Sequence, residues 1–136
     1  MFTDRELEYL TGQPLGRLAT SAPDGTLQVN PVGYRVDRDR GTIDIGGWGM
    51  SRSRKYRNVA DNGRAAFVVD DVASTDPWRV RFLEVRGHAE TIEDPGGDPS
   101  AAVIRLRPER ILALGLEPGD LERSPHELTV RSRDVG

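Results

Sequence analysis

Residues 15–36 read LGRLATSAPDGTLQVNPVGYRV, in which two strand-like runs flank a polar turn. The runs are Leu15–Ser21 and Leu27–Val36, and the segment between them contains Pro23, Asp24 and Gly25, residue types that favour chain reversal. Two runs joined in this way predict an antiparallel β-hairpin.

Further strands are expected along the rest of the chain. Thr42–Ile45 is rich in β-branched residues, and Val80–Ile92 alternates apolar with polar residues over a long run. A tally of six to seven antiparallel strands predicts a mainly β fold, a barrel with short helices or a sandwich, rather than a βαβ sheet. The other strand candidates are Ala65–Val69, Val103–Arg107 and Ile111–Leu116, with Asp70–Pro77 as a loop and residues 101–106 also compatible with a helix.

Two short helices complete the predicted secondary structure. Thr3 and Glu6 occupy the positions of a capping box, so residues 1–12 are expected to begin with a helix. Residues 50–60 are expected to form the second helix, capped by Ser51 or Ser53.

Length and composition limit the classes of protein. The 136 residues carry a net charge of −3 and no cysteine, which argues against nucleic-acid or anionic-membrane binding and excludes disulfides and thiolate metal sites. No apolar run approaches the ~20 residues of a membrane span, and no signal peptide is recognisable, so a cytoplasmic protein is expected. We expect one domain, 1–136, whose polar tail, 117–136, has no pattern that settles whether it is ordered. With 36% apolar residues the core is lean, which leaves room for burial against a second subunit.

The strongest chemical signal follows the strand Thr42–Ile45. A glycine-rich loop leads into a predicted helix start that carries Ser51, Arg52, Ser53, Arg54 and Lys55, the only lysine in the chain. Glycines allow close backbone approach, a helix N-terminus offers free N–H groups, and basic side chains neutralise an anion, so the segment is a candidate phosphate cradle. The alternative is a tight connection followed by a solvated basic helix face.

The other candidate residues give weaker evidence of a functional site. His88 and His126 lack metal-ligand spacing, and no serine stands in a nucleophile-elbow motif, so we predict no metal site and no catalytic side chain. Arg79 and Arg81 could bind a ligand or form ion pairs. The aromatic residues could stack on a planar ligand, although packing or a dimer interface is the favoured interpretation for Tyr34, Trp48, Trp78 and Phe82.

Several motifs occur in a familiar order between Glu6 and Leu116. They are Gly16-Arg17-Leu18-Ala19-Thr20, Asn30-Pro31-Val32, Arg54-Lys55-Tyr56-Arg57-Asn58-Val59 and Val85-Arg86-Gly87-His88-Ala89-Glu90. With them the chain resembles the pyridoxamine 5'-phosphate oxidase-like (PPOX class) split β-barrels of the flavin/deazaflavin oxidoreductase superfamily. The motif Asp76-Pro77-Trp78-Arg79 is similar to one that members of the short deazaflavin branch often carry.

This resemblance implies a homodimer with two sites at the subunit interface, each holding coenzyme F420 or FMN. It places the cofactor phosphate at Arg54 and Lys55, with Ser51 and Ser53 as neutral hydrogen-bond partners. With such a cofactor bound, Trp78 and Arg79 are our candidates for closing the substrate side. The strand contacts that the resemblance implies are Asn30, Pro31 and Val32, less surely Arg35, and then Ile45, Gly46 and Gly47.

Three departures from the family pattern bear on the cofactor and substrate. FMN-dependent relatives usually carry arginine at Asn30 and glutamine at Phe82, and deazaflavin relatives often carry Ser-Trp where this chain has Ala113-Leu114. The resemblance therefore implies hydride transfer between C5 of coenzyme F420 and an acceptor such as an enone or quinone. The alternatives are an FMN oxidoreductase, a non-catalytic ligand-binding protein, and haem handling through His88 or His126.

Overall fold

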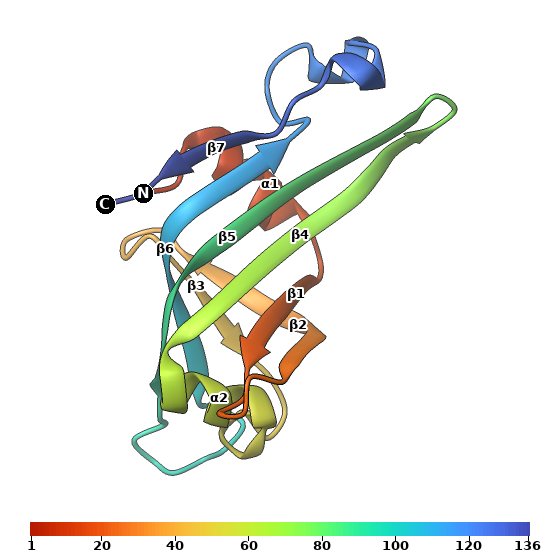
Figure 1. Ribbon diagram of the computed structural model, residues 1–136. Coiled ribbons are helices and arrows are strands. Elements are labelled where there is room, and N and C mark those ends of the chain that lie inside the picture. The colour runs from red at the N-terminus through yellow and green to blue at the C-terminus, as the bar shows by residue number, and fades with distance from the viewer.

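The computed structural model describes all 136 residues as a β-barrel with two short helices and three 3-10 turns (Figure 1). The strands are β1 Gly16–Ser21, β2 Leu27–Asp37, β3 Thr42–Gly46, β4 Arg64–Thr75, β5 Trp78–Ile92, β6 Val103–Leu114 and β7 Arg131–Asp134. The helices are α1 Asp4–Gly12 and α2 Arg54–Asn62, and the 3-10 turns are η1 Met50–Arg52, η2 Asp120–Glu122 and η3 Pro125–Glu127.

All strand pairs are antiparallel, in the order β3-β2-β1-β4-β5-β6-β7. An additional pairing of β3 with β6 closes the sheet into a barrel, with Asp44 opposite Arg105 and Ile45 opposite Ile104. The prediction of a mainly β fold with six to seven antiparallel strands is confirmed, and the sandwich alternative is excluded by this closure.

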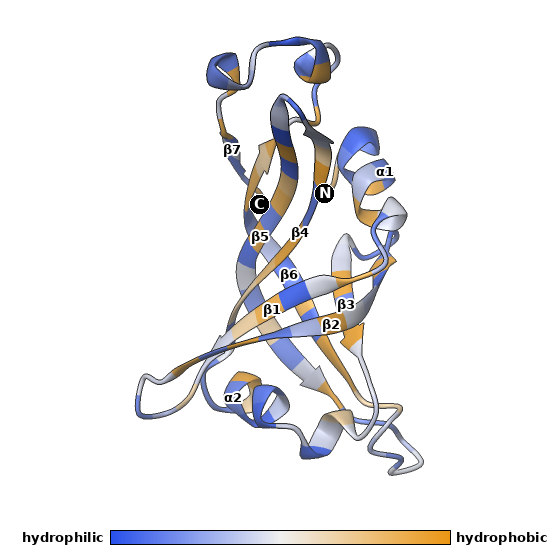
Figure 2. Ribbon diagram, turned by 90° about the vertical axis from the view of Figure 1, so that its right-hand side faces the viewer, coloured by the Kyte–Doolittle hydropathy of each residue, from blue (hydrophilic) through white to orange (hydrophobic).

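The barrel interior holds the apolar core. Apolar and polar residues alternate along much of the strands (Figure 2), and the buried apolar residues form one core cluster. Tyr34 packs edge-on against Phe67 with ring centroids 4.9 Å apart, and a Cβ at Gly16 would lie 2.3 Å from the Phe67 ring. Close packing around Phe67 therefore requires glycine at position 16.

Both predicted helices form. The Thr3 hydroxyl accepts a hydrogen bond from the Glu6 N–H and the Glu6 carboxylate accepts one from the Thr3 N–H, which makes the predicted capping box. α2 begins after Ser53 and ends at Gly63, which has φ of 68°. No helix is both long and apolar enough to cross a membrane.

Three segments differ from the predictions. The expected loop Asp70–Pro77 is mostly strand, because β4 stays paired with β5 as far as Thr75. The two strands expected at 103–116 are one, because Pro108 sits at a register shift opposite Gly87, where a missing N–H is tolerated. Part of the unpatterned tail forms β7 on the edge of β6.

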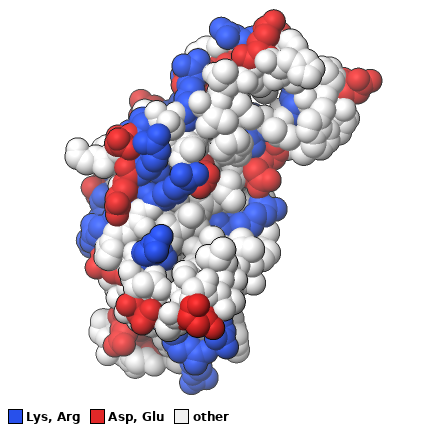
Figure 3. All heavy atoms as spheres, in the orientation of Figure 1, with Lys and Arg blue, Asp and Glu red and all other residues white.

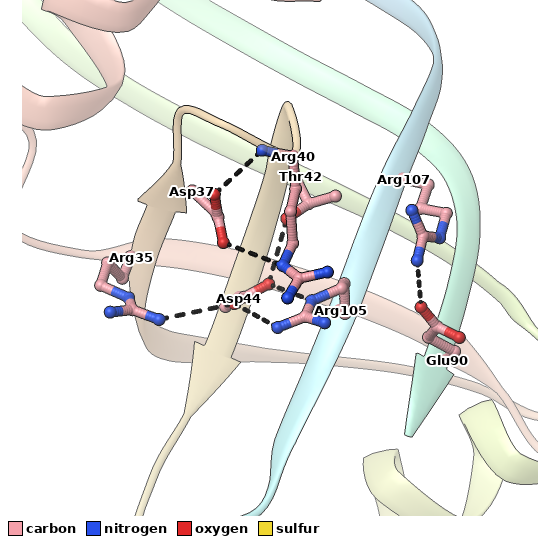
Figure 4. A network of polar contacts seen from close by, with 8 residues as sticks. All are labelled: Arg35, Asp37, Arg40, Thr42, Asp44, Glu90, Arg105 and Arg107. Atoms are coloured by element: carbon pink, nitrogen blue, oxygen red, sulfur yellow. Dashed lines mark hydrogen bonds and ion pairs between the residues drawn. The ribbon is translucent and has the colours of Figure 1, made fainter. Parts of the chain in front are cut away.

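A buried ion pair joins the two strands that close the barrel (Figure 4). Arg105 donates from Nε and Nη2 to the two carboxylate oxygens of Asp44, both at 3.0 Å, and the Asp44 side chain is only 3% exposed. This bond raises the pKa of the Arg105 guanidinium. Thr42 adds a hydrogen bond to Asp44 at 3.2 Å, so the carboxylate has partners on both strands.

We expect Asp44→Asn to destabilise the protein by about 3 kcal/mol, since it leaves a half-buried guanidinium without its counter-ion. The free energy of unfolding in urea measures the loss. Glu84→Gln is the matched control, because Glu84 pairs with the exposed Arg86, and it should cost less than about 1 kcal/mol. Equal losses would show that the barrel closure does not depend on the pair.

Candidate functional site

The predicted cradle lies where β3 ends. The chain passes from Gly46 through an exposed turn into η1 and then α2. Gly49 has φ of 60° and donates its N–H to the Ser100 hydroxyl at 2.9 Å, and the Ser51 N–H donates to the Pro99 carbonyl at 3.1 Å. The loop is therefore held in place by the segment that precedes β6.

The start of α2 is strongly cationic. Arg52 and Arg54 are exposed and Lys55 is half-buried, none of them makes an ion pair, and the first turn contains no acidic residue. Basic side chains gather at the lower end of the molecule in Figure 3, where α2 lies in Figure 1. Cations at a helix N-terminus oppose the helix dipole, so a bound anion would relieve an unfavourable arrangement.

The Asp24 carboxylate, in the β1–β2 turn, is attracted by one cation of this cluster. Hydrogen bonds from Thr26 hold the pKa of the Asp24 carboxyl below its usual range, and Arg54 contributes a smaller attraction. Asp24 is fully exposed and makes no ion pair with Arg54, so the guanidinium remains available to a ligand.

The two cradle serines differ in what they already bind. The Ser53 hydroxyl accepts from the Tyr56 N–H at 3.2 Å and donates to the Met50 carbonyl at 2.7 Å, so it serves as the cap of α2. The Ser51 hydroxyl makes no hydrogen bond within the chain, which leaves it the freer of the two for a ligand.

A shallow groove lies between β2 and β3 and includes Gly46, the last residue of β3, from which the loop leads to the cradle. Gly33 lies opposite Gly46 in the register, and a Cβ on either glycine would have no atom within 4 Å. With Tyr34, Arg35, Asp44 and Val103 these glycines line an opening of about 340 Å³. A planar or extended ligand can lie close to the backbone here.

The strand residues predicted to contact the cofactor are divided between the core and the outer face of the barrel wall. Val32 and Ile45 are buried in the core, at 5% and 0% exposure, so only their backbone can reach a ligand. Pro31 is exposed on the outer face, and Gly46 and Gly47 lie in or beside the groove. The Asn30 amide oxygen accepts a hydrogen bond from Gln28 at 2.6 Å.

Asn58 was quoted only within a family motif, not predicted as a site residue, and it is buried on the inner face of α2. Its amide donates to the Thr20 hydroxyl at 3.1 Å and to the Gln28 amide oxygen at 3.4 Å. This polar network ties α2 to β1 and β2 and ends at Asn30. A single asparagine in a basic helix carries no local signal that would have revealed it.

The substrate-side candidates do not meet the cradle within one chain. Trp78 and Arg79 begin β5 at the tip of the β4–β5 hairpin, at the opposite end of the molecule from α2 (Figure 1). Arg79 donates from Nη2 to the Arg123 carbonyl at 3.0 Å. Trp48 and Trp78 are 97% and 60% exposed, so neither tryptophan packs within its own chain, and of the predicted roles a dimer interface or a ligand contact is left for them.

The remaining candidates are accounted for by local contacts. Arg81 forms an ion pair with Asp71, which is the alternative to ligand binding, and His88 and His126 are both exposed. No group of three or more His, Asp or Glu side chains lies close enough together to hold a metal ion.

The chain is similar to several known proteins. Residues 2–115 match the family described as pyridoxamine 5'-phosphate oxidase. The chain is 44% identical over 139 residues to a 5a,11a-dehydrotetracycline/5a,11a-dehydrooxytetracycline reductase of Streptomyces rimosus, with 99% of this chain and 97% of the relative covered. A solved F420 reductase shares 30% identity with a TM-score of 0.60, over 76% of this chain and 94% of its own. A conserved hypothetical protein of Mycobacterium tuberculosis has the same fold at 18% identity, with a TM-score of 0.70 over 91% of this chain and 90% of its own.

We expect Ser53→Ala to lower the stability of the ligand-free protein by about 1 kcal/mol, because it removes the cap of α2. Ser51→Ala, two residues earlier, should leave the stability within about 0.5 kcal/mol of the original. Urea unfolding of the two variants makes the comparison. Equal effects would mean that Ser53 does not act as the cap.

Proposed function

Since the chain belongs to the pyridoxamine 5'-phosphate oxidase family, we propose that it is an oxidoreductase that uses coenzyme F420 and holds the cofactor phosphate at the start of α2. The observation that carries the proposal is the unpaired group of cations, Arg52, Arg54 and Lys55, which the chain reaches a few residues after Gly46 of the open groove. A phosphate supplies the negative charge that this helix start lacks, and charge-assisted hydrogen bonds to Arg and Lys are strong.

The residues present fit a ligand with a phosphate at one end and a planar ring at the other. Arg54 and Lys55 would hold the phosphate, and the Ser51 hydroxyl would add a neutral hydrogen bond. The Gly33–Gly46 pair leaves space above the strands, where a side chain would otherwise stand. When bound, the deazaflavin ring supplies a carbon that gives or accepts hydride, and the protein supplies binding and orientation.

For the acceptor we propose a polycyclic enone. The relative at 44% identity is named as a reductase of dehydrotetracyclines, and "dehydro" denotes a double bond that reduction saturates. The named reductase also favours an enzyme over a non-catalytic binding protein. By analogy with this relative, hydride passes from the cofactor to the acceptor, which is reduced.

FMN is the alternative cofactor, because it shares the phosphate and the three-ring shape. Asn30 and Phe82 stand where the resemblance implies arginine and glutamine in FMN-dependent relatives. Asn30 is bonded to Gln28, and Phe82 is half-buried on β5, so neither supplies a charge to the ligand. Coenzyme F420 is therefore the proposed cofactor.

We also propose a homodimer. Leu27 and Val29 on β2 are 81% and 65% exposed, and Val72 on β4 is 49% exposed. These side chains are exposed on the two strands that flank β1, and apolar exposure of this kind is typical of a surface covered by a partner.

We expect Arg54→Ala/Lys55→Ala to weaken F420 binding at least about 100-fold, since each charge-assisted bond contributes roughly 1.5 kcal/mol. Arg38→Ala/Arg64→Ala is the control with the same change in charge, and both of its residues are exposed and free of ion pairs. Fluorescence titration of each variant with F420 and with FMN gives the dissociation constants. Equal weakening by the two pairs would refute the cradle, and preference of the unmodified protein for FMN would refute F420 as its cofactor.

A further inference from the structure

A chain of three side-chain amides runs from the inner face of α2 to β2. Asn58, which is 2% exposed, donates from its amide nitrogen to the Gln28 amide oxygen at 3.4 Å. Gln28 in turn donates from its amide nitrogen to the Asn30 amide oxygen at 2.6 Å. Asn58 also donates to the Thr20 hydroxyl on β1 at 3.1 Å. Both amide-to-amide hydrogen bonds therefore run in one direction, from α2 toward Asn30.

The amide nitrogen of Asn30 is the free end of this chain. It donates no hydrogen bond within the protein, although the Asn30 side chain is only half-buried. It is not sealed from water, since the buried side-chain polar atoms without a partner are Tyr56 Oη and Arg79 Nε. The N–H2 group of Asn30 is therefore a donor that a ligand can reach.

This free donor lies near the cationic start of α2. β3 ends opposite Gly33, so residues 27–32 of β2, Asn30 among them, pair with β1 alone and their other edge has no neighbouring strand. Arg54 stands four residues before Asn58 on α2, and side chains with this spacing lie on one face of a helix. The Asn30 amide is thus two hydrogen bonds away from the helix turn that begins with Arg54.

The direction of the chain decides what a ligand meets at β2. An amide has a donor on one side and an acceptor on the other, so each amide that turns over forces its neighbour to turn over as well. If Asn58 offered an oxygen to Gln28, Gln28 would offer its own oxygen to Asn30, and the outward atom of Asn30 would be an oxygen. An oxygen repels an anion, whereas the N–H2 group that the structure shows there attracts one.

Building on the proposed function, we infer that Asn58 and Gln28 are positioning residues that hold the Asn30 amide with its N–H2 group toward the cofactor phosphate. Hydrogen bonds to an anionic oxygen are about twice as strong as bonds between neutral groups, so a phosphate is the ligand group that such a donor binds best. Asn30 then adds a neutral donor to the charges of Arg54 and Lys55, and the buried end of the chain keeps that donor from turning away.

The test reverses the chain with Asn58→Asp, which keeps the shape of the side chain but offers only oxygens. Gln28 must then donate to position 58 and turn its own oxygen toward Asn30, whose N–H2 group turns inward. We expect the affinity for F420 in a fluorescence titration to fall at least about tenfold. The affinity for the phosphate-free deazaflavin core should change less than about twofold, a selectivity that a general loss of structure would not produce.

Two controls separate this effect from the added charge. Asn62→Asp makes the same change on the same helix, and Asn62 likewise donates to β1, to the Ser21 carbonyl at 2.6 Å, but it lies outside the chain of amides. It should leave both affinities within about twofold. Asn30→Ala alone should weaken F420 binding about as much as Asn58→Asp does. Once Asn30→Ala is present, Asn58→Asp should cost little more, because no amide remains to turn over.

Three outcomes would overturn the inference: an equal loss of affinity for F420 and for the core, an equal effect of Asn62→Asp, or a full effect of Asn58→Asp in the presence of Asn30→Ala. Gln28→Glu, which reverses the chain one step later, replaces Asn58→Asp if circular dichroism shows that the latter does not fold. FMN and riboflavin replace the two ligands if the unmodified protein prefers FMN. Failure of the unmodified protein to bind either cofactor would overturn the proposed function, and the inference with it.

Discussion

The pairing of β3 with β6, with its Asp44–Arg105 ion pair, is the constraint on which the cradle depends. β3 is only five residues long and carries buried residues on both faces, Ile43 and Ile45 inside the barrel and Asp44 beneath the arginines. Closure fixes the point at which β3 ends, and the glycine loop and α2 start there. Because the loop is also bonded to Pro99 and Ser100 just before β6, the same closure fixes both sides of the loop.

Features with a local cause were predictable from the sequence. The capping box of α1, the hairpin at 15–36 and the Ser53 cap of α2 depend on residues close together in the chain. The length of β4, the continuity of β6 through Pro108 and the pairing of β7 depend on distant partners, and local pattern gave no sign of them. Within the candidate site, alternation along β2 and β3 could have shown that the side chains of Val32 and Ile45 face the core.

The exposure of both tryptophans could not be predicted from the composition. In a chain with two tryptophans, packing is the ordinary expectation, yet both are exposed, one in the loop after β3 and the other at the start of β5.

The proposal that Arg54 and Lys55 bind the cofactor phosphate is tested most directly by a thermodynamic cycle. One change removes the phosphate from the ligand, and the other removes the two cations from the protein. Calorimetric affinities of F420 and of its phosphate-free deazaflavin core are compared for the unmodified protein and for Arg54→Ala/Lys55→Ala. We expect either change alone to weaken binding strongly, and both changes together to lower the binding free energy little more than one change does. Losses that simply add would contradict it, because the cations and the phosphate would then act independently.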